Sequence, residues 1–357
     1  MASPSSEITT MLLTARACAA SLALLVPLAV AAPAAAESFA VDPAIPSYAP
    51  GNAKPMAGAA YLTSDGAIRI GGAVHAKFVV ERANALYAKT HPGAKLVDVS
   101  AGAETAIPNL TYNRILVGSM GRPIKLLEAA GFKSAFGAEP IEIRVAHAAN
   151  DTSQHLATSL AVYIHRDNPI TQLTTTQVAQ ILTIGNTGGD FSRWGQLGLK
   201  GDWTKRLIHP LGTPQYSGFG TWMLANRLDG KPYSTRYEEY SSTDELLKRL
   251  ESEPGGITVA AIGRETDRIK QVAVAETPEG PFIKGTPTEI QANKYPYSRY
   301  LYFYARREAD GKIDPVAADY LKLLLSKEGQ DIFAAQANGY IPLNAADAAI
   351  ERAKLDQ

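Results

Sequence analysis

Ser217, Gly218 and Gly220 stand directly before an expected helix, in the stretch PQYSGFGTWM of residues 214–223. A serine at such a position can cap the helix, because its hydroxyl accepts a hydrogen bond from an amide of the first turn. The same turn can also hold an anion, because its N–H groups and the helix dipole face a negative ligand. From this stretch alone, both roles are open for Ser217.

Three further loops of small residues follow an expected strand and precede an expected helix. The four loops are Gly71-Gly72-Ala73, Ser100-Ala101-Gly102-Ala103, Gly118-Ser119-Met120-Gly121-Arg122 and Ser217-Gly218-Phe219-Gly220-Thr221. Taken singly, each loop could serve only to end a strand and begin a helix. Together they favour an oxyanion cradle, in which backbone N–H groups and hydroxyls supply directional hydrogen bonds.

Enzyme signatures are scarce in this sequence. It contains no H-E-x-x-H, C-x-x-C, G-x-x-x-x-G-K-[ST] or G-x-S-x-G motif, and Gln215 stands where a nucleophile elbow needs glycine. We expect the histidines, which have no ligand spacing, at the surface or at element edges; they are His75, His91, His147, His155, His165 and His209. The sequence favours a binding protein without a catalytic residue, cofactor or metal. A phosphatase stays as an alternative that an activity assay would test.

The loops need strands that bring them to one edge of a sheet. The segments AIRIGGA, KLVDVSAGAE and RILVGSMGR each begin as a short apolar strand and lead through a loop into a helical pattern. Such alternation predicts a mostly parallel α/β sheet. In these sheets, ligands bind at the carboxyl ends of the strands, where the loops lie.

The second half of the chain continues the alternation. Strands are expected at 158–170, 205–213, 269–275 and 297–306, and helices at 174–184, 242–252, near 263–267, at 315–339 and at 344–355. Thr174 or Thr175 is the expected cap of the helix that begins there. Residues 37–64 are rich in proline, alanine and glycine, so we expect a flexible arm.

The N-terminus has the sequence of regions that is typical of a secretory signal peptide. Arg16 precedes an uncharged run, ACAASLALLVPLAVAAPAAA, which ends at a small-residue cleavage site before Glu37. An uncleaved membrane anchor is the alternative, which Pro27 and Pro33 disfavour. Cleavage after residue 36 would remove Cys18, the only cysteine. Because 35 basic residues balance 35 acidic ones, no global positive field recruits nucleic acid.

Several stretches resemble the periplasmic phosphate-binding proteins of ABC importers, the PstS-like members of the type II periplasmic binding protein family. They are LAVYIHRDNPITQLTTTQVAQILT…WGQLG, HPLGTPQYSGFGTWM, YPYSRYLYFYAR with the closing helices, and VGSMGRPIK, which is similar to the family's Ser-Arg-Pro loop. The resemblance covers nearly all of the mature chain. It implies an α/β fold of two hinged lobes, each a mostly parallel sheet flanked by helices, with phosphate between the lobes.

The resemblance also implies a domain organisation. Residues 1–36 are the signal peptide, 37–64 the arm, 65–160 plus 300–357 the first lobe, and 161–299 the second lobe. The hinges are expected near 156–163 and 295–301, where the chain passes between the lobes. The ligand-binding residues implied are Gly72, Ala73, Gly102, Ala103, Ser119, Arg122, Ser217, Gly218, Phe219 and Thr221.

One departure from the family pattern concerns the ligand loop. Family members often show Arg-Asp-x-x-Ser-Gly-Thr, whereas this chain reads TPQYSGF at residues 213–219, so Ser217 and Gly218 remain but the arginine and aspartate do not. Arg122 could supply charge in their place. Glu104 could accept the proton of hydrogen phosphate, or could be only a helix-capping or surface residue.

The implied function is a secreted, monomeric binding protein without a cofactor. It would capture phosphate or a related oxyanion in the periplasm and deliver it to an ABC permease of the inner membrane. The missing Arg-Asp pair keeps a second hypothesis open: a paralogue that has lost phosphate transport and acts as a sensor, a matrix or adhesion protein, or a binder of another ligand.

Overall fold

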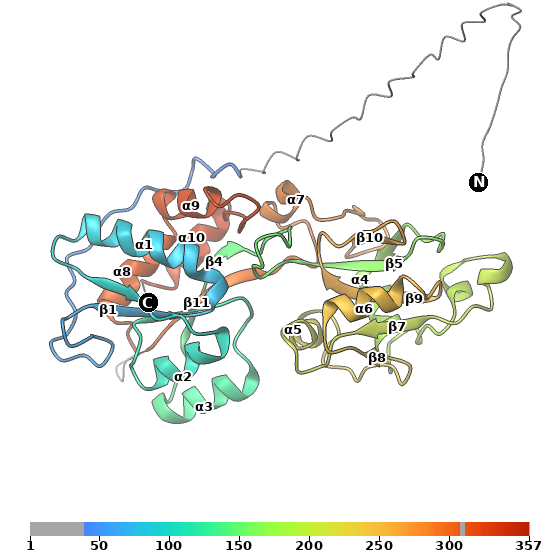
Figure 1. Ribbon diagram of the computed structural model, residues 1–357, viewed down its shortest axis with the longest axis horizontal. Helices are drawn as coiled ribbons and strands as arrows, with labels where there is room; N and C mark the ends of the chain where they lie inside the picture. The colour runs from blue at the N-terminus through green and yellow to red at the C-terminus, as the bar shows by residue number, and fades with distance from the viewer. Residues whose placement is uncertain (1–38, 308–310, 357) are drawn as a thin grey trace, which may run out of the picture. The chain divides into compact units, whose positions relative to one another are not determined.

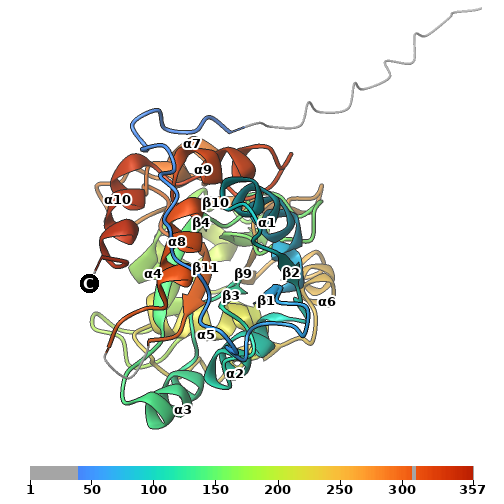
Figure 2. The same ribbon diagram turned by 90° about the vertical axis from the view of Figure 1, so that its left-hand side faces the viewer.

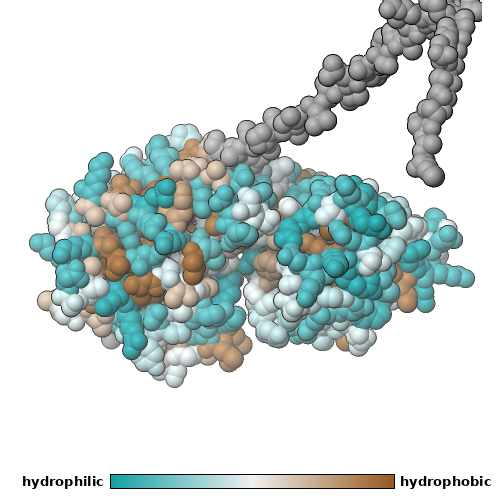
Figure 3. Space-filling model, viewed as in Figure 1, coloured by the Kyte–Doolittle hydropathy of each residue, from teal (hydrophilic) through white to brown (hydrophobic). Residues whose placement is uncertain are grey.

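The computed structural model describes residues 39–307 and 311–356. The expected signal peptide therefore lies outside the described residues. Within them, two sheets with separate hydrophobic cores form the two lobes of an α/β fold (Figure 1). None of the described helices has the length and apolarity that a bilayer crossing requires. The face in Figure 3 is largely hydrophilic, with apolar side chains in small separate patches.

The first sheet has the strand order β2-β1-β3-β11-β4. Its strands are β1 (Ile68–Gly72), β2 (Leu96–Asp98), β3 (Val117–Met120), β4 (Ile141–His147) and β11 (Tyr300–Ala305). β1 runs parallel to β2 and β3, whereas β11 is antiparallel to β3 and β4. The carboxyl ends of β1, β2 and β3 therefore meet at one edge.

Helices cover both faces of the first sheet (Figures 1 and 2). Side chains of α1 (Lys77–Thr90), α8 (Pro315–Leu324), α9 (Lys327–Ala334) and α10 (Ala345–Ala353) line one face, and those of α2 (Ala106–Thr111) and α3 (Leu126–Phe136) the other. Because side chains alternate along a strand, Leu301 and Phe303 of β11 enter the first core while Tyr302 and Tyr304 pack toward α2 and α3.

The second sheet has the order β6-β10-β5-β9-β7-β8. Its strands are β5 (Leu160–His165), β6 (Gln172–Thr174), β7 (His209–Gly212), β8 (Glu238–Glu239), β9 (Gly256–Ala261) and β10 (Ile269–Ala275), and its helices are α4 (Thr175–Leu182), α5 (Gly218–Asn226), α6 (Thr243–Leu250) and α7 (Pro287–Gln291). β5 is antiparallel to both neighbours, and the other described pairs are parallel. In each sheet, the antiparallel strand is the first one after the chain crosses between lobes.

The two crossing segments, residues 148–159 and 292–299, are hydrogen-bonded to each other. The amide of Ala148 donates to the carbonyl of Arg299 at 2.8 Å, and the Arg299 guanidinium donates to the carbonyl of Thr158 at 3.0 Å. Just after the first segment, the amide of Leu160 donates to the carbonyl of Tyr297 at 3.0 Å. Side-chain packing changes from the first core to the second between Ala157 and Leu160. It changes back between Tyr297 and Tyr300, so both changes fall within the expected hinge ranges.

Residues 39–64 differ from the flexible arm that we expected. They form no regular helix or strand, but Ile45 and Tyr61 are each 2% exposed within the first core. The amide of Tyr48 donates to Glu328 at 2.7 Å, and that of Gly51 to Asp319 at 3.0 Å. The packing of this segment could not be predicted from local sequence patterns, because these hydrogen-bond partners are 280 and 268 residues away in the sequence.

Local expectations have mixed outcomes. Thr174 caps α4 by accepting the Gln177 amide at 3.1 Å, as predicted. The helix expected near 263–267 is wrong: this segment connects β9 to β10, and Glu265 accepts the amide of Gln271 at 2.8 Å. The long helix expected over 315–339 is two helices, because Ser326 begins α9 by accepting the Gly329 amide at 3.2 Å.

Candidate functional site

The first and third predicted loops, residues 71–73 and 118–122, are joined through Ser119 at the end of β3. Gly72 pairs with Ser119 across β1 and β3. The amide of Ala73 donates to the carbonyl of Ser119 at 2.8 Å and to its hydroxyl at 3.0 Å, and that hydroxyl donates to Gly71 at 3.3 Å. Ser119 is fully buried. Its side chain therefore fixes the spacing of the two loops.

The loop after β2 joins the same group through Gly72. The amides of Ala101 and Gly102 donate to the Gly72 carbonyl at 3.1 and 2.9 Å. Gly72 has φ 110°, and a Cβ there would lie 2.2 Å from the Ser119 carbonyl oxygen, so only glycine fits. Gly72, Ala73, Gly102, Ala103 and Ser119 are thus brought together at the strand ends.

Two short turns start from these loops. Ala73 precedes a 3₁₀ turn (Val74–Ala76) that leads into α1, and Gly102 precedes one (Ala103–Thr105) that leads into α2. No side chain caps either turn in this described part of the chain. First-turn N–H groups without a capping side chain are the donors that an anion can use.

Ser217 caps α5, as one of its two predicted roles required. Its hydroxyl accepts the Gly220 amide at 3.0 Å and lies 2.8 Å from the Thr213 hydroxyl. The Thr221 hydroxyl donates to the Ser217 carbonyl at 2.8 Å. A Cβ at Gly220 would lie 2.4 Å from the Pro214 carbonyl oxygen, so glycine permits this tight entry into the helix. Contact of Ser217 with a ligand stays a prediction.

Arg122 lies between two carboxylates. Its guanidinium donates to both oxygens of Glu128 at 2.7 and 2.8 Å and to Glu104 at 2.6 Å. Burial acts to lower the pKa of Arg122, but the charges and hydrogen bonds of Glu128 and Glu104 raise it above its ordinary value. Arg122 is only 5% exposed. Its charge is therefore largely compensated within the protein.

Glu104 lies at the surface of the same cluster. Its side chain is 67% exposed and also approaches Lys125 at 3.3 Å. Glu104 lies in the 3₁₀ turn before α2 and forms ion pairs with Arg122 and Lys125. A part in accepting a ligand proton stays a prediction.

Arg299, which sequence reasoning missed, connects the first-lobe loops to the Ser217 loop. Its guanidinium donates to the carbonyl of Gly121 at 2.8 Å and to that of Thr158 at 3.0 Å. The same group lies 5.1 Å from the ring centre of Phe219, in the first turn of α5. The signal that could have found it is an arginine inside the aromatic strand pattern YSRYLYFY.

Residues 57–328 match the family model described as the PBP superfamily domain. The chain is 30% identical over 315 residues to the phosphate-binding protein PstS of Pseudomonas aeruginosa, covering 87% of this chain and 91% of that protein. It is 22% identical over 267 residues to the PstS protein of Staphylococcus epidermidis, covering 74% of each.

The chain belongs to the PstS-like family of phosphate-binding proteins. Among solved structures, the PstS of Borrelia burgdorferi has a TM-score of 0.52 at 17% identity, covering 77% of this chain and 98% of that one. An ABC-type phosphate transport receptor from Vibrio cholerae has a TM-score of 0.51 at 16% identity, covering 77% and 99%. These structures share the two-lobed fold.

His75 lies beside Arg299 in this PstS-like protein. The His75 ring packs closely on Gly121, whose carbonyl accepts from Arg299, because a Cβ at Gly121 would lie 2.7 Å from that ring. His75 Nδ1 is 2.6 Å from the Tyr340 hydroxyl. Burial, with a smaller contribution from the Arg299 charge, lowers the pKa of His75 to about 4. The ring is therefore neutral at pH 7 and adds no positive charge.

His147 and His165 are the last residues of β4 and β5, so they lie at element edges as expected. They are 0% and 5% exposed, so neither lies at the surface. In the described chain, no three histidine, cysteine, aspartate or glutamate side chains are placed to hold a metal ion. A cavity of about 670 Å³ at the lobe junction is lined by Arg144, Trp222, Arg227 and other residues, but by none of the predicted ligand residues.

Proposed function

We propose that this chain is a non-enzymatic, monomeric substrate-binding protein that captures phosphate in the periplasm. It then delivers the anion to the permease of an ABC importer in the inner membrane. The curated relatives named as phosphate-binding proteins support the ligand. The observation that carries the proposal is the meeting of loops from both lobes around Arg299, with Gly121 on one side and Phe219 on the other.

Phosphate would be held mainly by hydrogen-bond donors. The turns after Ala73 and Gly102 offer first-turn amides from the first lobe, and the turn after Ser217 offers them from the second. Helix dipoles add partial positive charge at the same points. Each hydrogen bond to a charged ligand contributes about 1.5–3 kcal/mol.

The anion would also connect the two lobes. A ligand that contacts both lobes stabilises the arrangement in which all its donors are in reach, and so shifts the equilibrium between lobe arrangements. Motion about the crossing segments 148–159 and 292–299 would interconvert these lobe arrangements, so that the permease could distinguish the protein with phosphate from the protein without it.

A second candidate function is a PstS-like paralogue that no longer transports phosphate. It would act as a sensor, a matrix or adhesion protein, or a binder of another ligand. The Glu104 and Glu128 carboxylates on Arg122 favour this candidate, because they reduce the positive charge available to a dianion. Thr213, where family members often have arginine, adds no charge.

Titration calorimetry on residues 37–357, unfolded and refolded to remove retained anions, tests the proposal. We expect a Kd for phosphate below about 1 µM, which corresponds to a binding free energy more favourable than about −8 kcal/mol. We expect much weaker binding of sulfate. N-terminal sequencing of the secreted protein should begin at or near Glu37. Absence of phosphate binding, with another anion retained in native mass spectra, would favour the paralogue.

A further inference from the structure

We propose that Arg299 supplies the positive charge of the oxyanion site, acting through its electric field from beneath the loops rather than as a direct ligand. This inference rests on the proposed function, because it assumes that phosphate binds where the loops of the two lobes meet. It gives the charge of the site to a residue outside the predicted ligand set.

The first step is that Arg299 is a buried charge without a counter-ion. The Arg299 side chain belongs to a residue that is only 3% exposed. Among the described residues, the side chains whose charge affects its pKa are those of Tyr302 and Tyr340, and no carboxylate is among them. Burial lowers the pKa of Arg299 to about 10, so the guanidinium stays protonated at neutral pH. A buried, unpaired charge is costly, and a bound anion would reduce that cost.

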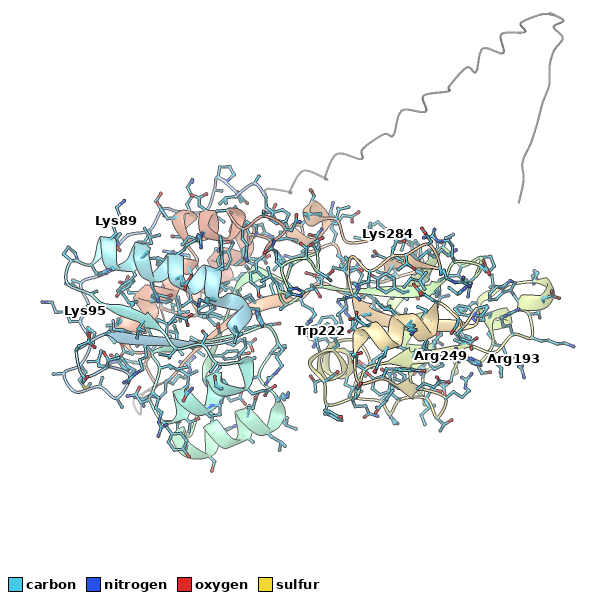
Figure 4. All side chains as sticks on the ribbon, in the orientation of Figure 1. Lys89, Lys95, Arg193, Trp222, Arg249 and Lys284 are labelled. Atoms are coloured by element: carbon cyan, nitrogen blue, oxygen red, sulfur yellow. The ribbon has the colours of Figure 1, made fainter. Side chains whose placement is uncertain are left out.

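The second step is its position. Arg299 donates to Gly121, in the loop that follows β3, and its guanidinium lies over Phe219 in the first turn of α5. Trp222, one turn further along α5, is 6.0 Å away and lies on the side of that helix near the crossing segments (Figure 4). The charge therefore lies where the donors of both lobes converge.

The third step compares the two buried arginines of this region. Arg122 is already paired with Glu104 and Glu128, whereas the hydrogen-bond partners of Arg299 are neutral carbonyls. The Nε–H group of Arg299 is buried and has no partner among the described residues. Neutral carbonyl partners leave the field of the guanidinium uncompensated, so that field reaches an anion at the neighbouring loops.

A purely structural role is the alternative. Arg299 also links the Gly121 loop to the crossing carbonyl of Thr158, so it could serve only as a brace. A brace and a charge predict different results for substitutions that keep or remove the charge. Arg299→Lys keeps it, whereas Arg299→Gln removes it.

Phosphate titrations of the wild type and three variants separate these roles. Arg299→Lys should bind within about threefold of the wild type, and Arg299→Gln about tenfold or more weakly, the scale of one charge several ångströms away at an effective dielectric of about 20. Arg227→Gln is the matched control, because Arg227 lies 5.8 Å from the Trp222 ring but is paired with Glu276 at 2.9 Å. It should bind within about threefold of the wild type.

The outcomes are distinct. A brace predicts that Arg299→Lys and Arg299→Gln melt at lower temperature without phosphate and both keep the wild-type affinity, which would overturn the inference but leave the proposed function intact. Failure of the wild type to bind phosphate overturns both. Should Arg299→Gln not fold, Arg299→Met, which fills similar volume without a charge, repeats the measurement with the same expected loss.

Discussion

The Ser217 hydroxyl can serve the fold and a ligand together. A hydroxyl has one donor and two acceptor positions, and the Gly220 amide and the Thr213 hydroxyl can both occupy the acceptors, which leaves the O–H group for an anion. Ser217→Ala should therefore lower stability by about 1 kcal/mol. It should also weaken phosphate binding about tenfold to a hundredfold, the loss of one charged hydrogen bond.

Ser242→Ala is the matched control for this prediction. Ser242 caps α6 by accepting the Glu245 amide at 3.2 Å and belongs to none of the predicted ligand loops. Melting curves should show a similar loss of stability for both variants, while calorimetry should show weaker phosphate binding only for Ser217→Ala. Unchanged affinity in Ser217→Ala would leave Ser217 with the capping role alone.

The Arg122 cluster predicts a dependence of stability on pH. Burial acts to raise the pKa of Glu128, but hydrogen bonds from Arg122 and the Lys125 amide bring it below its ordinary value of 4.5. A carboxylate with a lowered folded-state pKa contributes stability above its unfolded value, and that contribution is lost as pH falls through the folded value. Removing Arg122 should therefore cost stability at neutral pH and much less in acid.

Urea unfolding of Arg122→Ala at pH 7 and pH 3 measures this dependence. We expect a loss of about 3 kcal/mol at pH 7, because a partly buried carboxylate is left unpaired, and a smaller loss at pH 3. Arg114→Ala, at an exposed arginine of the same lobe, should change stability by less than about 0.5 kcal/mol at either pH. An equal loss at both pH values would show that packing, not the ion pair, explains the effect.

At the scale of elements, the strand–loop–helix units could be predicted because their patterns are local. The apolar runs before Gly72 and Gly118 and the caps Thr174 and Ser217 carry those signals within a few residues. The alternating stretch IEIRVAH gave an equally local signal for β4, which our sequence reasoning did not use. The break at Ser326 also had a local signal, because this serine ends an apolar run and the polar stretch KEGQD follows it, but our prediction continued one helix through it.

The close approach of β1 and β3 was not predictable, since it depends on tertiary contacts of Gly72. Gly72→Ala should destabilise the protein by several kcal/mol, because its Cβ would lie 2.2 and 2.4 Å from the Ser119 backbone oxygen and nitrogen. Gly66→Ala is the control: its φ of 80° is also positive, but nothing lies within 4 Å of the added Cβ. It should cost about 1 kcal/mol, and equal losses in urea unfolding would contradict the close approach.

At the scale of the molecule, the sequence resemblance predicted two lobes, and the described residues form two sheets, each packed against a large hydrophobic core of its own. What it did not predict is how each core recruits distant segments. Phe39 packs against the second core and Ile45 enters the first, although both belong to the expected arm. Ile341 enters the second core from a C-terminal segment assigned to the first lobe, and it exchanges backbone hydrogen bonds with His147 at 2.8 and 3.1 Å.

The position of Ile341 in the second core predicts that its truncation destabilises the second lobe, which an unfolding experiment can follow. The three tryptophans, Trp194, Trp203 and Trp222, all lie within residues 161–299, so their fluorescence follows the second lobe. Ile341→Ala should cost about 2–5 kcal/mol and lower the urea midpoint seen by fluorescence, because it leaves a cavity in the second core. Leu343→Ala is the matched control, since Leu343 is equally buried but packs in the first core.

The two variants should differ most between probes. Leu343→Ala should shift the transition seen by far-ultraviolet circular dichroism, which follows both lobes, more than the transition seen by fluorescence. Saturating phosphate should bring the two transitions together, because an anion held by both lobes stabilises each only while the other is folded. Identical shifts from both variants and both probes without phosphate would show that the lobes already unfold as one unit, and that the crossing segments alone couple them.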